Sequence, residues 1–525
     1  MRMTPSKLPE VKTNIIDKTI AVFSPQRAAK RYRARMMLAM AGGYAGASRT
    51  RRSLKQWTPS GYDADSDILP DLPTLRDRSR DMIRNMPLAS GAMNTKVTNV
   101  VGTGLRLQAR IDREALNLDE AQADAWESKT EREWRLWWDS FDCDAARTLR
   151  GDGLTTMVYR QALENGDVFV LLPRISRKTN PYTLALQTIE ADRVSNPDNQ
   201  RDTATLSGGI EKDKHGAPTA YHVMNAHPGR LYGSAGNTWQ RIPAYGQKLG
   251  LKNILHIYRP TRPGQSRGVP DLAAVIEPLK QLTRYAEAEL MAAVVSAMFT
   301  VFVETETGDP TFDLTDMSGE TGSSTSDDDY KLGNGSIIGL APGEKIHDSN
   351  PGRPNAAFDP FTQAILRQIG VAIELPFELL VKHFTASYSA ARAALLEAWK
   401  YFSTQRKWMT DHFNRVVYEI WMYEAVSSGR IVAPGFFTDP IIRQAYLGSV
   451  WIGPAKGQID ELKEIKAAEL RVDMGVSTLS EVTAEMTGGD WEKKHPQSVK
   501  EHNARKDAGL ITETVNNGDL PDENF

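Results

Sequence analysis

The five residues Gly264–Gly268, GQSRG, form a G-x-S-x-G motif, the spacing that holds a serine nucleophile on a strained turn between a strand and a helix. An apolar, β-branched run ends at Tyr258, before the motif, and a helix-like pattern follows it. If the strand fed directly into the turn, the Ser266 hydroxyl would be presented for attack on an acyl carbon. The motif therefore raises the hypothesis of a serine hydrolase with Ser266 as its nucleophile.

The surrounding residues argue against this hydrolase. Pro260 and Pro263 interrupt the chain between the strand and the motif, and Pro270 suits the first turn of the next helix, well past Ser266. No HGGG-type sequence lies upstream to supply an oxyanion hole. The later histidines stand in no distinctive context: His347, His383 and His412. We predict that residues 264–268 form a flexible, basic loop and that the match to the motif is chance.

Two further groups have the composition of a site but the wrong spacing. In SYSAAR, residues 387–392, an S-x-x-K serine enzyme would need a lysine where Arg392 stands, and a guanidinium cannot act as a base. Ser387 or Ser389 is better explained as the cap of the following helix. The consecutive acids Asp327–Asp329 lack the alternation that gathers ligands around a cation. Because H-E-x-x-H, G-x-x-x-x-G-K-[ST] and G-x-G-x-x-G are also missing, the sequence predicts no catalytic residues, no metal site and no cofactor.

The composition is that of an ordinary soluble chain, with 525 residues, 40% of them apolar and 25% charged. This length predicts two to four compact regions. The single cysteine, Cys143, excludes an intrachain disulfide and a cysteine-rich metal site. The longest apolar stretch, Met291–Val303, is shorter than a membrane span, and no signal-peptide pattern opens the sequence. We therefore expect intracellular folding and no contact with a membrane.

The net charge of −2 conceals a strong asymmetry along the chain. Residues 1–60 carry thirteen Lys and Arg against two acids, a net of +11, which leaves −13 for the remainder. The end of the chain, 507–525, has five acids and no base. A basic arm on an acidic body is typical of contact with nucleic acid or with an acidic protein face, and equally of a simply solvated arm.

Periodicity and turn signals predict an α+β fold. Helices are expected at 25–40, on either side of Pro87 between Thr74 and Gly102, and at 119–141, 154–163, 270–297, 361–373, 389–428, 458–474, 478–486 and 491–506. Strands are expected at 167–174, in the β-rich region that follows down to Tyr258, and at 299–305 and 336–340. Residues 1–20 are expected to be irregular, 306–335 to form a polar loop, and 376–387 to form a second loop.

Several ordered blocks of the sequence resemble the lambda-type portal proteins of tailed bacteriophages. The blocks are YAGASRTRRSLKQWTPSGYDADSD at 44–67, LRDRSRDMIRNMPLASGAMNTKVTNVVGTGLRLQ at 75–108, the stretch from GQSRGVPDL to FTVFVET at 264–305, IELPFELL at 373–380, SYSAARAALLEAW at 387–399, and the stretch from GSVWIGPAKG to MGVSTL at 448–479. Within them Arg80-Asp81, Arg84-Asn85 and Gly102-x-Gly104 match the family pattern. The resemblance spans about residues 20–510 and departs in the polar loop and the acidic end.

This resemblance implies a structural protein rather than an enzyme. It implies a homo-oligomeric ring, typically of twelve subunits, at one vertex of the phage head. The ring would be the channel for double-stranded DNA during packaging and ejection, and the dock first for terminase and then for the head–tail connector protein. Major capsid or scaffold protein would be a further neighbour. The protein would belong to the virion and be assembled in the host cytoplasm.

The portal layout can be placed on the expected elements. It gives a basic N-terminal arm (1–60), a first wing part (61–277), a stem helix (278–297), a clip with the polar loop (298–360), a second stem helix (361–375), a tunnel loop (376–388), a long helix with the second wing part (389–456), a crown (457–510) and an acidic tail (511–525). The tunnel-loop candidates for lining the DNA channel are Lys382, His383, Thr385 and Ser387. Repeated around a ring, Lys382 and His383 would form a narrow positive collar. The alternative is that they lie on a surface loop and are merely solvated. The rival functions are a hydrolase using Ser266 and a nucleic-acid-binding protein acting through its arm.

Overall fold

The computed structural model of the protein describes residues 15–40, 44–49, 51–231, 236–297, 301–305, 344–348, 355, 357–384, 387–457 and 460–510. It divides into two compact units, Met1–Asp63 and Ala64–Phe525. The expected strand at 336–340 and the acids Asp327–Asp329 lie outside the described residues.

The first unit contains a pair of helices that pack on each other, α1 (Ile15–Phe23) and α2 (Pro25–Met40), followed by a short 3₁₀ turn, η1 (Ala45–Ala47). Ser24 joins the helices, and its N–H donates to the carbonyl of Ile20 at 2.8 Å. The predicted basic helix at 25–40 is confirmed. The expectation of an irregular segment over residues 1–20 is wrong from Ile15 onward, because α1 gains a packing partner in α2 that its own short sequence does not announce.

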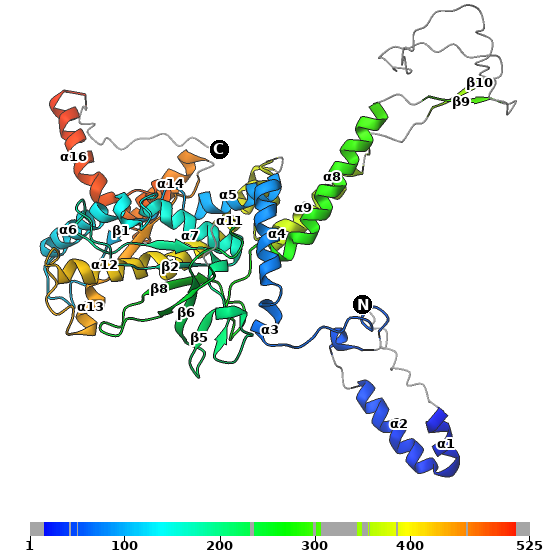
Figure 1. Cartoon of the computed structure of the whole chain (residues 1–525). Helices are drawn as coiled ribbons and strands as arrows, with labels where there is room; N and C mark the ends of the chain where they lie inside the picture. The colour runs from blue at the N-terminus through cyan, green and yellow to red at the C-terminus, as the bar shows by residue number, and fades with distance from the viewer. Residues whose placement is uncertain are drawn as a thin grey trace, which may run out of the picture. The chain divides into compact units, whose positions relative to one another are not determined.

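The first helices of the second unit are α3 (Ala64–Ile68), α4 (Leu72–Asn85) and α5 (Pro87–Val100), followed after strand β1 (Arg106–Ala109) by α6 (Glu120–Trp138) and α7 (Gly151–Asn165) (Figure 1). Pro87 separates α4 from α5 as predicted, and Gly102 ends the region with a φ of 58°. Asp119 caps α6 by accepting the backbone N–H of Gln122 at 2.7 Å. The region was expected to begin at Thr74, but α4 begins at Leu72, and Pro73 occupies its first turn.

The strands form small antiparallel sheets. A three-stranded sheet has the order β3-β2-β8, and a four-stranded sheet has the order β4-β5-β6-β7. The bounds are β1 (Arg106–Ala109), β2 (Asp167–Leu171), β3 (Gln187–Ile189), β4 (Leu206–Ser207), β5 (Ile210–Lys212), β6 (Pro218–Met224), β7 (Trp239–Pro243), β8 (Ile254–Tyr258), β9 (Val301–Thr305), β10 (Glu344–Asp348) and β11 (Ser449–Ile452). The β-rich region predicted before Tyr258 is confirmed. The pairs β1–β11 and β9–β10 each make a separate two-stranded ribbon.

Two hydrophobic cores stabilise this unit. The larger one is built on tryptophans, with Trp134 stacked on Trp138 at 4.7 Å and edge-on to Trp421 at 5.2 Å between ring centroids. The single cysteine, Cys143, is fully buried in this core. The smaller core lies between the two larger sheets, where Phe169 of β2 meets Tyr221 of β6 at 5.8 Å.

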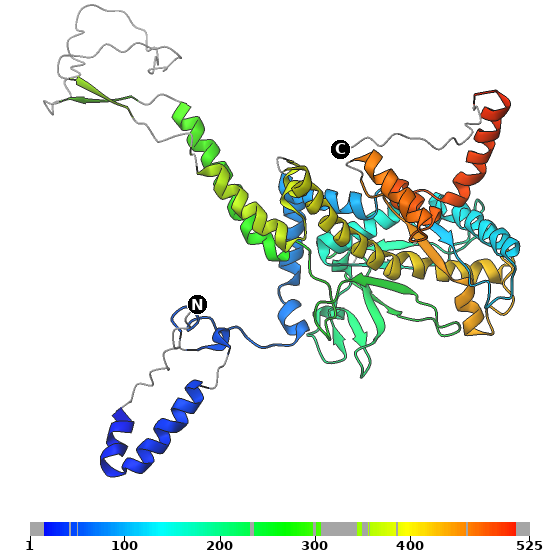
Figure 2. The same cartoon turned by 180° about the vertical axis from the view of Figure 1, so that it is seen from behind.

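Helices α8 (Ile276–Ala297) and α9 (Phe358–Ala372) run side by side (Figures 1 and 2). Leu279 and Leu282, near the start of α8, are buried in the larger core. The helix was expected to begin at Pro270; it begins at Ile276, because residues 273–275 form a 3₁₀ turn, η5. α8 is one unbroken helix across Pro278, which is tolerated in its first turn.

The expected loop at 376–387 contains a short helix, α10 (Phe377–Val381), so that prediction is wrong over these residues. The long helix predicted after Ser387 is confirmed as α11 (Tyr388–Met409) and α12 (Arg415–Ser427), joined without a break by a π turn, η6 (Thr410–Asn414).

The C-terminal part is helical, as predicted: α13 (Pro440–Tyr446), α14 (Glu461–Asp473), α15 (Leu479–Thr487) and α16 (Trp491–Asp507). The helix α13 was not predicted. Thr478 caps α15 through a reciprocal pair with Glu481. The chain is therefore an α+β protein, with helices outweighing small antiparallel sheets.

Candidate functional site

The G-x-S-x-G motif lies in the 259–272 segment, which leads from the end of β8 at Tyr258 towards α8 at Ile276. Ser266 is buried, and its Oγ donates to Oδ2 of Asp65 at 2.5 Å while its backbone N–H donates to Oδ1 of the same carboxylate at 2.7 Å. A second hydroxyl, Ser207 Oγ, lies 3.3 Å from Ser266 Oγ. Within the described residues Ser266 has no hydrogen bond to a histidine. The serine is therefore held as a structural group, and it does not stand on a strand–turn–helix elbow.

The glycines of the motif are explained by packing and backbone conformation. A Cβ on Gly268 would lie 1.9 Å from the carbonyl oxygen of Gly166, so the 259–272 segment passes too close to the end of α7 for any side chain. Gly264 has a φ of 79°, a conformation that favours glycine. The motif thus reflects a close approach between two backbone segments rather than chemistry at Ser266.

Arg267, also in the motif, is the centre of a buried network around Asp167, the first residue of β2. Asp167 is completely buried and accepts from Arg267 Nε at 2.6 Å, Arg76 Nη2 at 2.7 Å and His256 Nε2 at 3.2 Å. Burial alone would raise the pKa of Asp167, but the guanidiniums of Arg267 and Arg76 outweigh it and hold that pKa far below its usual range. Asp167 is therefore ionised and charge-neutralised in the folded protein.

Every N–H group of the Arg267 guanidinium donates a hydrogen bond. Its Nη1 donates to the carbonyls of Val194 at 2.7 Å and Gly208 at 2.8 Å, and its Nη2 donates to the carbonyl of Ala191 at 2.7 Å. With the two bonds to Asp167, the side chain joins the 259–272 segment to both larger sheets. Only a planar group with five N–H donors can make this set of bonds, so a lysine would not substitute.

A second buried network holds the far end of the same segment. Lys96 of α5 is fully buried and donates to Asp271 Oδ2 at 2.6 Å and to the Tyr401 hydroxyl at 3.0 Å. Arg259 Nη2 donates to Asp271 Oδ1 at 2.7 Å, and its Nη1 donates to Gln405 of α11 at 3.0 Å. Burial would raise the pKa of Asp271, but Lys96 and Arg259 lower it. The 259–272 segment is therefore held in place through three carboxylates: those of Asp65 and Asp167 outside it, and its own Asp271, which binds Lys96.

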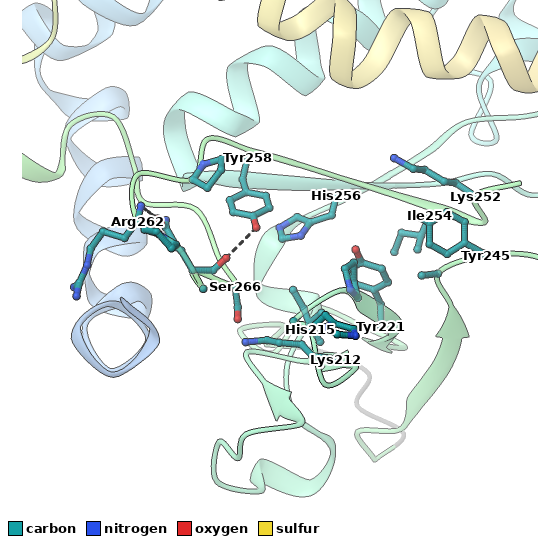
Figure 3. Close-up of a pocket in the computed structure, with 18 residues that line it drawn as sticks. Lys212, His215, Tyr221, Tyr245, Lys252, Ile254, His256, Tyr258, Arg262 and Ser266 are labelled. Carbon is teal, nitrogen blue, oxygen red and sulfur yellow. Dashed lines mark hydrogen bonds between the residues drawn. The ribbon is translucent and has the colours of Figure 1, made fainter. Parts of the chain in front are cut away.

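A cavity of about 500 Å³ opens beside this segment (Figure 3). Its walls come from β5, β6 and β8 and from the 259–272 segment, and its cationic lining residues are Lys212, Lys252 and Arg262. The ring of His256 lies between those of Phe169 and Tyr258, with centroids 4.3 and 4.2 Å away. Burial lowers the pKa of His256, so the imidazole inside the wall is neutral near pH 7.

The predicted channel residues lie at the turn between α10 and α11. Lys382 ends α10 in a left-handed conformation with a φ of 55°, and the backbone N–H of His383 donates to the carbonyl of Glu378 at 3.1 Å. Both side chains are exposed. Ser387 stands at the N-cap position of α11, but its Oγ lies 3.3 Å from Ser389 Oγ and makes no side-chain capping bond, so the predicted cap is absent. Thr385 lies outside the described residues.

The structure brings Lys382 and His383 together at one exposed tip but does not connect them with the pocket residues by any described bond. The sequence analysis did not identify the charged side chains of the two networks, namely Arg76, Lys96, Asp167 and Asp271. A signal did exist for some of them, since the Arg/Asp-rich block at 75–85 is one of those that carried the resemblance. Its residue Arg80 pairs with Asp192.

Other chemistry is not found in the described ranges. They contain no group of three or more His, Cys, Asp or Glu side chains able to hold a metal ion. No helix within them has both the length and the apolar character needed to cross a bilayer. Burial raises the pKa of the Cys143 thiol to about 12, so that thiol is unreactive.

Comparison with known proteins places these features in a family. Residues 50–406 match the family described as phage portal protein, lambda family. The chain is 27% identical over 497 residues to a portal protein of Escherichia phage N15, with 89% of this chain and 90% of that protein covered. It is 26% identical over 498 residues to portal protein B of Escherichia phage lambda, with coverage of 90% and 91%. Among solved structures it is similar to a chain in the neck of an empty GTA particle, at 13% identity and a TM-score of 0.42, covering 83% of this chain and 98% of that one.

Proposed function

The chain belongs to the lambda family of phage portal proteins, and from this premise we propose that it forms a closed ring at one vertex of a tailed-phage head, through which double-stranded DNA is packaged and later ejected. The match covers most of the chain, and both relatives are aligned over nearly their whole length. The proposal therefore concerns the whole protein rather than one shared domain. It makes the protein a component of the virion that is assembled in the host cytoplasm.

One observation carries the ring: the apolar face of the α8–α9 pair. Beyond the buried start of α8, three large apolar side chains are exposed, Leu290 at 68%, Met291 at 64% and Val294 at 47%. Phe361 of α9 adds a fourth, at 52%. Large apolar side chains exposed on a helix pair are often covered in an assembly, and a neighbouring copy of this chain would cover these.

The remaining elements fit the portal layout in order. In this proposal α8 and α9 are the stem helices, and the ribbon β9–β10 between them belongs to the clip, which docks terminase and then the head–tail connector protein. The residues 376–388 form the tunnel segment, α14 to α16 form the crown, and the sheets and the tryptophan core form the wing. Twelve subunits are expected, with major capsid or scaffold protein around the ring.

A channel through which DNA slides should not bind the DNA tightly. Each phosphate neutralised by Lys or Arg adds affinity and would retard movement, so a channel wall should hold few cations. Lys382 and His383 are exposed at the tip of the tunnel segment and would form one narrow positive collar in the ring. The proposed role needs no bond-making by this chain, since the ATP hydrolysis that drives packaging belongs to the terminase.

Light scattering and negative-stain imaging of the purified protein test the proposal. The expected result is a closed ring with a hole wide enough for duplex DNA. Met291→Glu should prevent ring formation because it buries a charge in the subunit contact. The matched control is Leu231→Glu, at a position 88% exposed in a wing loop, which should assemble normally. A wild-type chain that stays monomeric at every concentration and salt, and is not incorporated into proheads, would refute the ring.

A further inference from the structure

We propose that the pocket between β5, β6, β8 and the 259–272 segment is a docking site for an acidic peptide segment of a partner protein, one that carries an apolar side chain beside its carboxylates. This site is separate from the proposed DNA channel and does not depend on ring formation. Its recognition chemistry is visible in the lining of the pocket.

The first argument is charge. Of the 18 residues that line the pocket, three are lysine or arginine, Lys212, Lys252 and Arg262, two are histidines, His215 and His256, and none is acidic. Figure 3 shows that they come from different segments, with Lys212 on β5, Lys252 just before β8, and Arg262 on the 259–272 segment. Lys212 and Arg262 are paired with Asp65 and Asp67, so Lys252 is the charge that favours an anionic occupant.

The second argument is that the rim of the pocket already binds carboxylates. The acidic helix α3 lies along it, with Asp65 Oδ2 2.8 Å from Lys212 Nζ and Asp67 Oδ2 2.5 Å from Arg262 Nη1. The remaining cation, Lys252, forms no ion pair within the described part of the chain. One side of the pocket is therefore filled by an acidic segment of the protein itself, and the other side offers the same chemistry to a second one.

A neighbouring acid, Asp213, does not fill that second side. Its Oδ1 accepts the backbone N–H groups of His215 and Ala217, each at 2.8 Å, so its carboxylate is committed to the turn between β5 and β6. Glu211 faces away from the pocket and pairs with Arg241 and His222.

The third argument is the apolar floor. Ile210, Ala244 and Ile254 are buried and line the cavity. The rings of Tyr221 and Tyr258 add flat apolar walls. A small inorganic anion would leave this floor uncovered, whereas a leucine or phenylalanine next to a carboxylate would cover it.

The fourth argument is that the wall is rigid before any ligand arrives. Gln265 Oε1 accepts the backbone N–H groups of Thr261 at 2.8 Å and Arg262 at 3.2 Å, and the Tyr258 hydroxyl donates to the carbonyl of Gln265 at 2.9 Å. The bonds of Arg267 fix the next turn of the segment. A preformed wall lowers the ordering cost of binding.

The test uses fluorescence anisotropy with the full chain and a fluorescein-labelled twelve-residue peptide of repeated Asp-Leu-Glu. We expect saturable binding that weakens with salt, and no binding by the matched peptide of Asn-Leu-Gln. Lys252→Glu should weaken binding at least ten-fold. The matched control, Lys248→Glu, changes an exposed lysine that does not line the pocket and should leave the affinity within two-fold.

A gain-of-affinity variant sharpens the test. Asp67→Asn removes one negative charge from the rim and should tighten peptide binding about five-fold. Equal weakening by Lys252→Glu and Lys248→Glu would show unspecific charge attraction and overturn the proposal. A twelve-base-pair duplex that binds the wild type more tightly than the peptide, and loses that advantage in Lys252→Glu, would instead assign the pocket to phosphate. Thermal unfolding of each variant checks that the fold is intact, and the ring is measured separately, so the two proposals can fail independently.

Discussion

The 259–272 segment and the α10–α11 turn are both short, polar, basic connections next to long helices, yet the structure treats their charges in opposite ways. In the first, Arg267 and Arg259 are bound to the carboxylates of Asp167 and Asp271 inside the protein. In the second, Lys382 and His383 are exposed. The difference teaches that a basic side chain is held against the protein where a carboxylate neutralises it, and is left for solvent or a ligand where none does.

The largest expected effect comes from removing the central carboxylate of the first region. Asp167→Ala would leave Arg267 and Arg76 buried without a counter-charge, and breaking such a pair costs about 3–5 kcal/mol. We expect a large fall in the urea midpoint of unfolding, or an insoluble protein. Asp77→Asn, at a side chain that is 78% exposed, is the control and should change nothing measurable. An unchanged midpoint for Asp167→Ala would show that the network is not what fastens the segment.

Lowering the pH should destabilise the 259–272 segment before it affects the α10–α11 turn. The folded-state pKa values of Asp167, Asp192 and Asp271 are all lowered, so each carboxylate adds stability that is fully present above its unfolded pKa of about 4. That stability is lost as the pH falls from there through the folded pKa values. Urea midpoints measured between pH 6 and pH 2 should therefore drop steeply below pH 4. A flat profile over that range would contradict the assignment.

A smaller effect is expected at the motif serine. Ser266→Ala removes the hydroxyl bonded to Asp65 and should cost about 0.5–1.5 kcal/mol. An active-site-directed fluorophosphonate should not label Ser266 in the wild type, because its hydroxyl is buried against a carboxylate and is not activated by a histidine. Labelling that disappears in Ser266→Ala would restore the hydrolase hypothesis.

The smallest effect on stability is expected in the second region. Replacing Lys382 and His383 together by alanine should leave the unfolding midpoint unchanged, because surface substitutions usually alter stability by less than about 0.5 kcal/mol. In an assembled ring the same change should reduce the salt dependence of DNA binding, because fewer phosphates are neutralised. A clear loss of stability would mean that this tip is packed rather than presented to a ligand.

Local signals in the sequence predicted the elements that depend on local physics. Pro87 separates α4 from α5, and the capping pairs of Asp119 and Thr478 mark the starts of α6 and α15. The short helix α10 was missed because its five residues are stabilised by burial of Leu380 rather than by their own propensity. The strand pair β1–β11 was missed because its members come from opposite ends of the second unit.

The same reasoning explains what the sequence revealed about the sites. It correctly placed the G-x-S-x-G match in a loop, because Pro260, Pro263 and Pro270 are local signals. The prediction that this loop is flexible is wrong, because Gln265, Ser266 and Arg267 are buried and hydrogen-bonded to distant parts of the chain. It could not find the fastening network, since Asp167 is 91 residues from Arg76 and 100 from Arg267 along the chain. The role of the tunnel residues stays a prediction, because no DNA contact follows from the fold of one subunit.

The burial of Cys143 has a practical consequence for fluorescent labelling of this protein. The only thiol in the chain is fully buried and its pKa is raised to about 12, so maleimide dyes should leave the native protein unlabelled. A cysteine introduced at an exposed position, such as Ser387→Cys, would then carry the dye alone. In the proposed ring, the fluorophores would be identical and symmetry-related without first deleting a native cysteine, so distances across the proposed opening could be followed by energy transfer.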